Sequence, residues 1–309
     1  MSILDHIGRT PLVPLTHLSR GLPVQVWGKC EQSNPGGSIK DRLALAVVDD
    51  AERRGQLRPG DTLVEATAGN TGLGLALVAA VRGYHLVCVL PEKMSVDKRT
   101  ALAAVGAQVV ITPNAPPDAP ENFQNVARRM AEEHGWFLTD QFRNPVNVEV
   151  HERTTGPELL QAAPGLSAFV AGAGTGGTVT GVGRYLRRHA PTVRVVLADP
   201  VGSGLAGWVT HGVMGPDAPY AVEGIGSSRA PENFDRHVVH AVESISDDES
   251  FEVARRLHRE EGLWVGGSSG TAVAAALREA ARRSPGDGPV VAILADSWDR
   301  YRSKPWMAP

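Results

Sequence analysis

Short apolar runs alternate with longer amphipathic stretches along most of the chain. The runs are rich in Val, Leu and Ile and are apolar throughout, which is typical of parallel strands buried on both faces. Stretches such as ENFQNVARRMAEEHG have helical spacing, opened by a proline and an acidic first turn and closed by Gly135. The alternation predicts an α/β protein with helices on both faces of mainly parallel sheets. The expected strands lie at 24–29, 62–66, 86–90, 108–112, 167–172, 193–199 and 289–295.

The segment DQFRNPVN at 140–147 separates two sets of these strands. It is rich in polar turn residues, so we expect a boundary between two lobes near it.

The charge balance argues against a polyanionic partner. The 309 residues include 31 Lys and Arg and 34 Asp and Glu, for a net charge of −3, so we expect small-molecule substrates and neither nucleic acid nor membrane as a partner. The N-terminus lacks a basic segment followed by an apolar one, and no apolar run has the roughly 18 residues needed to span a bilayer. We therefore expect a cytoplasmic protein.

Cysteine and histidine give no sign of a metal or disulfide framework. Cys30 and Cys88 are the only cysteines and are far apart, so we expect two core thiols. The ten histidines are scattered, and the close pair His237 and His240 has no third ligand nearby in sequence. We assign no metal.

Lys40 is the candidate reactive residue in the first third of the chain. It follows NPGGSI, a turn that feeds a helix, and helical spacing places it on the apolar stripe of Leu43, Ala44 and Val47. A lysine that only lies along the helix end with its amine in water would give the same pattern. A partly desolvated amine at the positive end of a helix would instead favour the neutral form that a Schiff base requires.

Three glycine-rich turns each lead into a predicted helix. They are GNTG at 69–72, GAGTGGT at 172–178 and GGSSG at 266–270. Backbone N–H groups at such turns can bind a carboxylate or a phosphate, although a helix cap with close-packed glycines gives the same pattern. Together with a buried lysine, the turns describe a ligand that carries a phosphate, a carboxylate and an aldehyde.

The second turn also permits a different class of protein. Gly172, Gly174 and Gly177 fit G-x-G-x-x-G, and Asp199 follows at the end of the next strand, as in an NAD-dependent oxidoreductase. Against this, the hydroxyl groups of Thr175 and Thr178 suit a terminal phosphate, which needs many donors.

Seven motifs in fixed order give the chain a family resemblance. NPGGSIKDR, TAGNTG, PEKMS, DQFRN, GTGGT, EGIG and GGSSG, spread between residues 7 and 301, resemble the fold-type II pyridoxal-phosphate enzymes that include cysteine synthase and cystathionine β-synthase. Several of these motifs look more like the cystathionine β-synthase catalytic core. The resemblance implies a fold like that of the tryptophan synthase β-subunit and pyridoxal 5′-phosphate as cofactor.

The resemblance also implies a role for each motif residue. Lys40 would be the Schiff-base lysine and the catalytic base. Asn70 would bond the ring hydroxyl of the cofactor, and Ser268 would face its pyridine nitrogen. The cofactor phosphate would be bound by Gly174, Thr175, Gly176, Gly177 and Thr178, and the substrate carboxylate by Thr67, Ala68, Gly69, Thr71 and Gln141.

The family pattern further implies the domain organisation. We expect one catalytic unit over 1–309, with a smaller mobile lobe at 42–148 and a larger cofactor-binding lobe made of 1–41 and 149–309. We also expect a homodimer. Because the sequence ends at Pro309, no regulatory domain pair is expected.

The implied reaction is β-replacement on L-serine or O-acetyl-L-serine with a thiol, such as serine plus homocysteine giving cystathionine. Cysteine synthase, which uses O-acetylserine and sulfide, and a specialised β-substituted alanine synthase are the alternatives, and an NAD-dependent oxidoreductase is the alternative from another class. Ala68 stands where the family usually has serine, so we expect substrate binding to be weaker by about 1 kcal/mol. Ser227 and Ser228 follow EGIG in place of an aromatic-acidic pair, which leaves the second substrate open.

Overall fold

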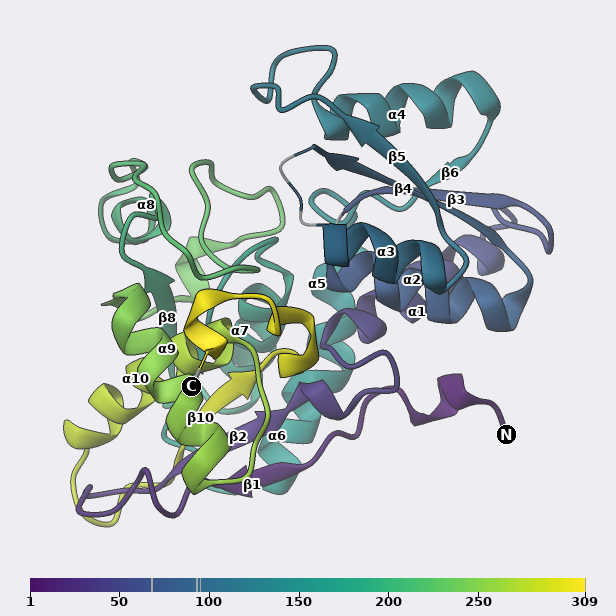
Figure 1. Ribbon diagram of the computed structural model, residues 1–309. Coiled ribbons are helices and arrows are strands. Elements are labelled where there is room, and N and C mark those ends of the chain that lie inside the picture. Colours follow the sequence, from purple (N-terminus) through teal and green to yellow (C-terminus); the bar gives the residue numbers. More distant parts are fainter. Residues whose placement is uncertain (68, 93, 95, 309) are drawn as a thin grey trace. The chain divides into compact units, whose positions relative to one another are not determined.

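A computed structural model describes residues 1–67, 69–92, 94 and 96–308. Chain contacts divide it into unit 1, made of Met1–Ile7 and Asn34–Val146, and unit 2, made of Gly8–Ser33 and Asn147–Pro309 (Figure 1). By these contacts, segment 34–41, which contains Lys40, groups with residues 42–146. The functions of the two predicted lobes remain a prediction.

Unit 1 is built on a parallel sheet with strand order β5-β4-β3-β6. Helices α1, α2 and α3 cover one face and α4 covers the other (Figure 1). Its two central strands are almost entirely buried, as expected for strands covered on both faces. The elements are η1 (Ile3–His6), α1 (Lys40–Arg53), β3 (Thr62–Ala66), α2 (Asn70–Arg82), β4 (His85–Pro91), α3 (Val96–Ala104), β5 (Gln108–Thr112), α4 (Phe123–His134) and β6 (Phe137–Leu138).

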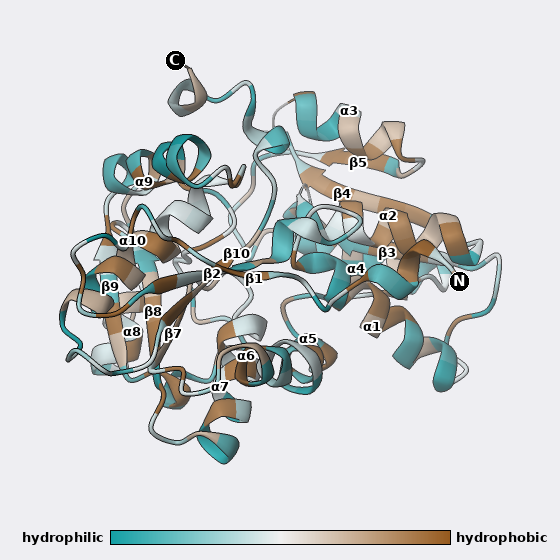
Figure 2. Ribbon diagram, turned by 90° about the horizontal axis from the view of Figure 1, so that it is seen from below, coloured by the Kyte–Doolittle hydropathy of each residue, from teal (hydrophilic) through white to brown (hydrophobic). Residues whose placement is uncertain are grey.

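Unit 2 is built on a sheet with strand order β1-β2-β10-β7-β8-β9, in which only the β1–β2 pair is antiparallel. Figure 2 shows α9 and α10 on one face of this sheet and α6 and α7 on the other, with hydrophobic residues concentrated in its central strands. The elements are β1 (Leu12–Pro14), β2 (Val26–Cys30), η2 (Glu31–Ser33), the π-helical turn η3 (His151–Thr155), α6 (Gly156–Ala162), β7 (Ala168–Ala171), α7 (Gly177–His189), β8 (Arg194–Pro200), α8 (Leu205–His211), η4 (Arg236–Val238), β9 (Ala241–Ile245), α9 (Asp247–Glu260), α10 (Gly267–Ala281), β10 (Val290–Leu294), η5 (Trp298–Tyr301) and η6 (Pro305–Met307).

Helix α5 (Val146–Val150) begins at the last residue of unit 1 and continues into η3. In the described parts of the chain, no helix has both the length and the apolar character needed to cross a membrane.

The predicted α/β fold class is confirmed, and each predicted apolar run overlaps a strand. The start of α4 was predicted less well. Its N-cap is Asn122, whose side chain accepts a hydrogen bond from the N–H of Gln124, so the acidic residue Glu121 precedes the helix. The end of α4 is as predicted, because Gly135 takes the left-handed conformation with φ +67°.

Both cysteines are core thiols, one in each unit. Cys30 ends β2 of unit 2 and is 2% exposed, and Cys88 lies in β4 of unit 1 and is fully buried. Burial raises the pKa of the Cys30 thiol to about 11 and that of the Cys88 thiol to about 12. Both thiols are therefore held in the protonated form, which is the less reactive one, in the folded protein.

Candidate active site

Lys40 is the first residue of α1, as the sequence predicts. Its backbone N–H donates to the hydroxyl group of the buried Ser38 at 3.2 Å, and its side chain is half-buried. The same helix buries Leu43 and Val47. The start of α1 packs closely on α2, since a Cβ atom at Gly74 would lie 3.2 Å from the carbonyl oxygen of Lys40. The position of the Lys40 backbone is thus fixed by the packing of two helices.

The helices that follow the three glycine-rich turns of the sequence lack a side-chain cap in the described structure. They are α2 after Gly69, α7 after Gly176 and α10 after Gly266. By contrast, α4 and α9 are capped by the side chains of Asn122 and Ser246. The first-turn N–H groups of an uncapped helix are available to an anion from outside the chain, and the helix dipole favours that anion. These helix starts coincide with the three glycine-rich turns of the sequence.

The start of α2 holds the first group of predicted residues. Asn70 begins the helix, and the N–H of Gly69 donates to the Thr67 hydroxyl group at 3.2 Å. No described side chain or backbone atom lies within 4 Å of the position that a Cβ atom of Gly69 would take. Packing therefore does not require glycine here, whereas close approach of a ligand would. Ala68 lies outside the described residues.

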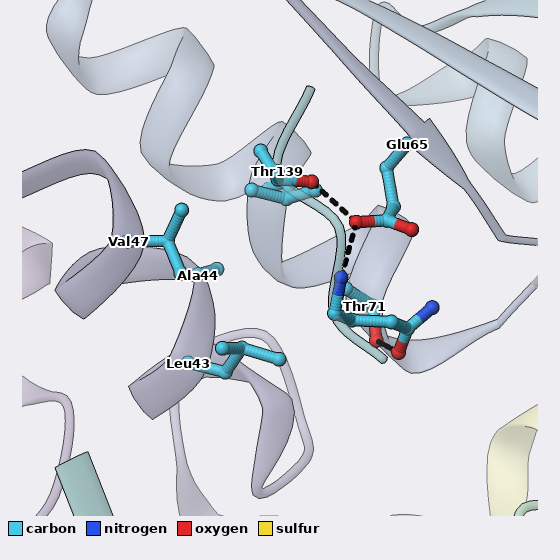
Figure 3. A pocket seen from close by; sticks show the side chains of 8 residues that line it. Leu43, Ala44, Val47, Glu65, Thr71 and Thr139 are labelled. Atoms are coloured by element: carbon cyan, nitrogen blue, oxygen red, sulfur yellow. Dashed lines mark hydrogen bonds between the residues drawn. The ribbon is translucent and has the colours of Figure 1, made fainter. Parts of the chain in front are cut away.

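A hydrogen-bonded cluster joins the end of β3 to the start of α2 (Figure 3). The Thr71 hydroxyl group donates to Oε1 of Gln141 at 2.6 Å. The carboxyl group of Glu65 accepts hydrogen bonds from the Thr139 hydroxyl group and, at 3.1 Å, from the Gln141 backbone N–H. The structure thus brings together Thr71 and Gln141, which lie far apart in sequence and were both predicted to bind the substrate carboxylate.

Glu65 is a site residue that the sequence pattern did not reveal. It is 1% exposed and is the acidic residue of the stretch TLVEA that forms β3. Burial raises the pKa of its carboxyl group to about 7, although hydrogen bonds from Thr139, Gln141 and Ala66 act in the opposite direction. The available signal was an acidic residue at the end of a buried strand, directly before a glycine-rich turn.

The Gly174–Thr178 loop in unit 2 is held by tight packing. A Cβ atom at Gly174 would lie 2.5 Å from the carbonyl oxygen of Gly224, and one at Gly176 would lie 2.7 Å from Cα of Phe234. Gly176 also has φ +86°, which side-chain-bearing residues rarely adopt. Thr175 is buried and Thr178 is half-buried.

Ser268 lies in the first turn of α10 and is 6% exposed. Its hydroxyl group makes no hydrogen bond with any residue that the structure describes. The next residue behaves differently, because the Ser269 hydroxyl group accepts a hydrogen bond from the Ala295 N–H at 3.0 Å. A nearly buried hydroxyl group of this kind suits a ligand that completes its hydrogen bonding.

Asp199 does not lie as a ribose-binding carboxylate would. It is fully buried in β8, and its Oδ2 accepts a hydrogen bond from the N–H of Ala206 in α8 at 2.9 Å. Burial raises the pKa of this carboxyl group to about 6. Asp199, the acidic residue that the G-x-G-x-x-G interpretation requires, therefore hydrogen-bonds the first turn of a neighbouring helix. The NAD alternative loses its main support.

Comparison with known families decides the class of protein. A family model described as "Pyridoxal-phosphate dependent enzyme" matches residues 3–296. The chain belongs to this family. It is therefore a pyridoxal-phosphate-dependent enzyme, and the NAD alternative is set aside.

Relatives within this family are β-replacement enzymes of the cysteine synthase and cystathionine β-synthase type. The chain is 42% identical over 306 residues to a cysteine synthase of Staphylococcus aureus, covering 98% of this chain and 96% of that protein. It is 46% identical over 307 residues to the cystathionine beta-synthase of Oryctolagus cuniculus, covering 98% of this chain and 55% of that protein.

Two solved structures have closely similar folds. An O-ureido-L-serine synthase superposes with a TM-score of 0.90 at 41% identity, covering 99% of this chain and 94% of that chain. An O-acetylserine-dependent cystathionine beta-synthase from Helicobacter pylori superposes with a TM-score of 0.90 at 37% identity, covering 100% of this chain and 99% of that chain.

The described residues fit pyridoxal phosphate. The uncapped start of α7, with the hydroxyl groups of Thr175 and Thr178 beside it, suits a phosphate. The unsatisfied hydroxyl group of Ser268 suits a ring nitrogen, and Lys40 supplies the amine at the start of α1. Lys40 and Asn70 belong to unit 1, whereas the loop and Ser268 belong to unit 2.

Proposed function

We propose that this enzyme replaces the β-substituent of L-serine or O-acetyl-L-serine with a thiol, as in the formation of cystathionine from serine and homocysteine. The observation that carries the proposal is the Thr71–Gln141 hydrogen bond of 2.6 Å at the uncapped start of α2. Backbone N–H groups and an amide at a helix N-terminus are suited to the α-carboxylate of an amino acid. The names of the relatives, which include an O-acetylserine-dependent cystathionine beta-synthase, support the choice of substrate.

The Thr71 hydroxyl group orients Gln141 in this proposal. The Thr71 proton is donated to Oε1 of Gln141, so the amide nitrogen is the end that can donate to a carboxylate. That nitrogen also donates weakly to the carbonyl oxygen of Ala66, at 3.4 Å. Thr67, Ala68 and Gly69 would contribute donors from the turn before the helix.

Lys40 would hold the cofactor covalently and, once displaced by the substrate, would accept the proton from the substrate Cα. Asn70 would bind the ring hydroxyl, and the Gly174–Thr178 loop would bind the phosphate. When bound, pyridoxal phosphate supplies a conjugated ring that accepts the electrons left by that proton. Ser268 is neutral and would not hold the ring nitrogen protonated as a carboxylate would, which favours loss of the β-substituent over transamination.

Cysteine synthase activity, with O-acetylserine and sulfide, is the second candidate. The match to a cysteine synthase over 96% of that protein's length supports it equally well. The Ser227 hydroxyl group, at a position that the sequence linked to second-substrate choice, donates to the carbonyl oxygen of Arg229 at 2.6 Å and so stabilises its own loop. A homodimeric, cytoplasmic enzyme remains our expectation.

The first test is the visible absorption spectrum of the purified protein, followed by addition of L-serine or O-acetyl-L-serine. A visible band that changes with one of them identifies the cofactor and the first substrate, and product analysis with homocysteine and with sulfide then separates the two candidates. Absence of a band after incubation with pyridoxal phosphate would contradict the proposal.

The Lys40→Ala variant tests the assignment of the lysine. We expect loss of the covalently held cofactor and of turnover. Lys304→Ala is the matched control, because Lys304 forms an ion pair with Glu223 in unit 2 and has no role in the proposal. Full activity of Lys40→Ala would overturn the mechanism.

A further inference from the structure

The π-helical turn η3 carries a buried histidine between two threonines. Nδ1 of His151 lies 2.9 Å from the hydroxyl oxygen of Thr155, and Nε2 lies 3.2 Å from the hydroxyl oxygen of Thr178. His151 is 1% exposed and Thr155 is fully buried. π-Helical turns are rare and frequently occur at functional sites. This one links a buried imidazole to the loop proposed to bind a phosphate.

The same segment holds the loop at a second point. The side-chain nitrogen of Asn147 donates to the Thr175 hydroxyl oxygen at 2.9 Å, and Asn147 is fully buried. Close packing fixes the spacing, because a Cβ atom at Gly181 of α7 would lie 2.8 Å from Cβ of His151. Side chains of one helical segment therefore bind both threonine hydroxyl groups of the loop.

The position of the imidazole proton decides what Thr178 can do. A neutral imidazole has one N–H donor and one acceptor nitrogen. If Thr155 donates to Nδ1, then Nε2 carries the proton and donates to the Thr178 oxygen, and the Thr178 hydroxyl proton remains for another acceptor. In the opposite tautomer, Nε2 accepts that proton. A phosphate offers acceptor oxygens, so only the first tautomer leaves Thr178 able to donate to it.

We propose that His151 is a positioning residue that, as its Nε2–H tautomer, directs the Thr178 hydroxyl proton toward the cofactor phosphate. The proposal rests on the role given above to the Gly174–Thr178 loop. His151 acts through Thr178 and contacts neither the substrate nor the reacting atoms in this scheme.

The test compares His151→Leu and His151→Gln with the wild type. Its readouts are the dissociation constant of pyridoxal phosphate, measured by titration of the apoenzyme, and the ³¹P resonance of the bound phosphate. For His151→Leu we expect the affinity for pyridoxal phosphate to fall by up to about tenfold and the ³¹P resonance to shift. The reason is that the hydrogen bond from Thr178 to the charged phosphate is weakened. Glutamine can place an amide donor near the position of Nε2, so we expect it to restore most of the affinity.

Two further measurements keep the proposal falsifiable if His151→Leu folds poorly. The ¹⁵N shifts of His151 in the wild-type holoenzyme report the tautomer directly, and Thr155→Val removes the donor to Nδ1 with little change of volume. His189→Gln is the control, since His189 is exposed at the end of α7. An Nδ1–H tautomer, or unchanged affinity and ³¹P resonance in folded His151→Leu, would overturn the proposal. Failure of the wild type to bind pyridoxal phosphate would instead overturn the proposed function.

Discussion

The Glu65 carboxyl group is enclosed at the end of β3, yet it accepts hydrogen bonds from Thr139, from Gln141 and from the N–H of Ala66. Burial raises its pKa from 4.5 to about 7. The folded protein therefore binds this proton more tightly than the unfolded chain does. The resulting stabilisation is fully present below pH 4.5 and is lost as the pH rises through about 7.

We predict that Glu65→Gln removes this pH dependence. Between pH 4.5 and pH 8, the free energy of unfolding of the wild type should fall by up to about 3 kcal/mol relative to that of the variant. Denaturant unfolding at a series of pH values measures it. Glu132→Gln, at an exposed position of α4, is the control. A difference that does not vary with pH would show that Glu65 titrates normally.

The Thr71 hydroxyl group offers a second prediction at this scale. Thr71→Val removes the donor that orients Gln141, so binding of the amino-acid substrate should weaken about tenfold, while the affinity for pyridoxal phosphate stays the same. Spectral titration with the amino acid measures the first quantity. Thr71→Ser should recover most of the affinity, and Thr210→Val on α8 should have no effect. Equal losses of substrate affinity in Thr71→Val and Thr71→Ser would argue against a role of the hydroxyl group in orienting Gln141.

At the scale of elements, the turn before α7 depends on the absence of a side chain at Gly176. Its φ of +86° and its closeness to Phe234 are independent reasons for glycine. Gly262, in the loop after α9, has φ +68° but no described atom within 4 Å of its Cβ position. Comparing substitutions at the two glycines therefore separates the free-energy cost of a steric clash from that of backbone strain.

We predict that Gly176→Ala lowers the free energy of unfolding by about 3 kcal/mol or more, whereas Gly262→Ala costs about 1 kcal/mol. Gly176→Ala should also weaken binding of pyridoxal phosphate, because the start of α7 must shift. Denaturant unfolding and titration of the apoenzyme give the two quantities. Similar values for the two variants would mean that packing on Phe234 contributes little.

Long apolar elements were predictable from the sequence because their burial on both faces leaves an uninterrupted apolar run. The strands that were missed lack that feature: β1 and β6 are very short, and β9 has a half-exposed sequence, AVESI. The π-helical turn could not be foreseen either, since its side chains are buried by contacts with residues far along the chain. Local periodicity carries no information about such contacts.

At the scale of the whole molecule, the ordered motifs were sufficient to predict the family and the cofactor. They did not reveal Glu65 or His151, which act through neighbours that lie far away in sequence, such as Gln141 and Thr178. Residues that contact a ligand directly form short motifs, whereas residues that position them are defined only by the fold.

Each unit contains one buried cysteine, Cys30 in unit 2 and Cys88 in unit 1. We predict that a thiol reagent such as Ellman's reagent labels neither cysteine in the native protein on the timescale of minutes, and labels both after denaturation. Single-cysteine variants, Cys30→Ala and Cys88→Ala, would then report the opening of each unit separately. Rapid labelling of the native protein would contradict the burial of these side chains.

The burial of Cys30 and Cys88 affects how the enzyme tolerates free thiols in its surroundings. With the proposed function, it handles free thiols or sulfide, which exchange readily with exposed cysteines and disulfides. The chain has only these two cysteines, and both are protonated and enclosed. We therefore expect the enzyme to turn over in mixtures of thiols and disulfides without forming mixed disulfides with its proposed thiol substrates.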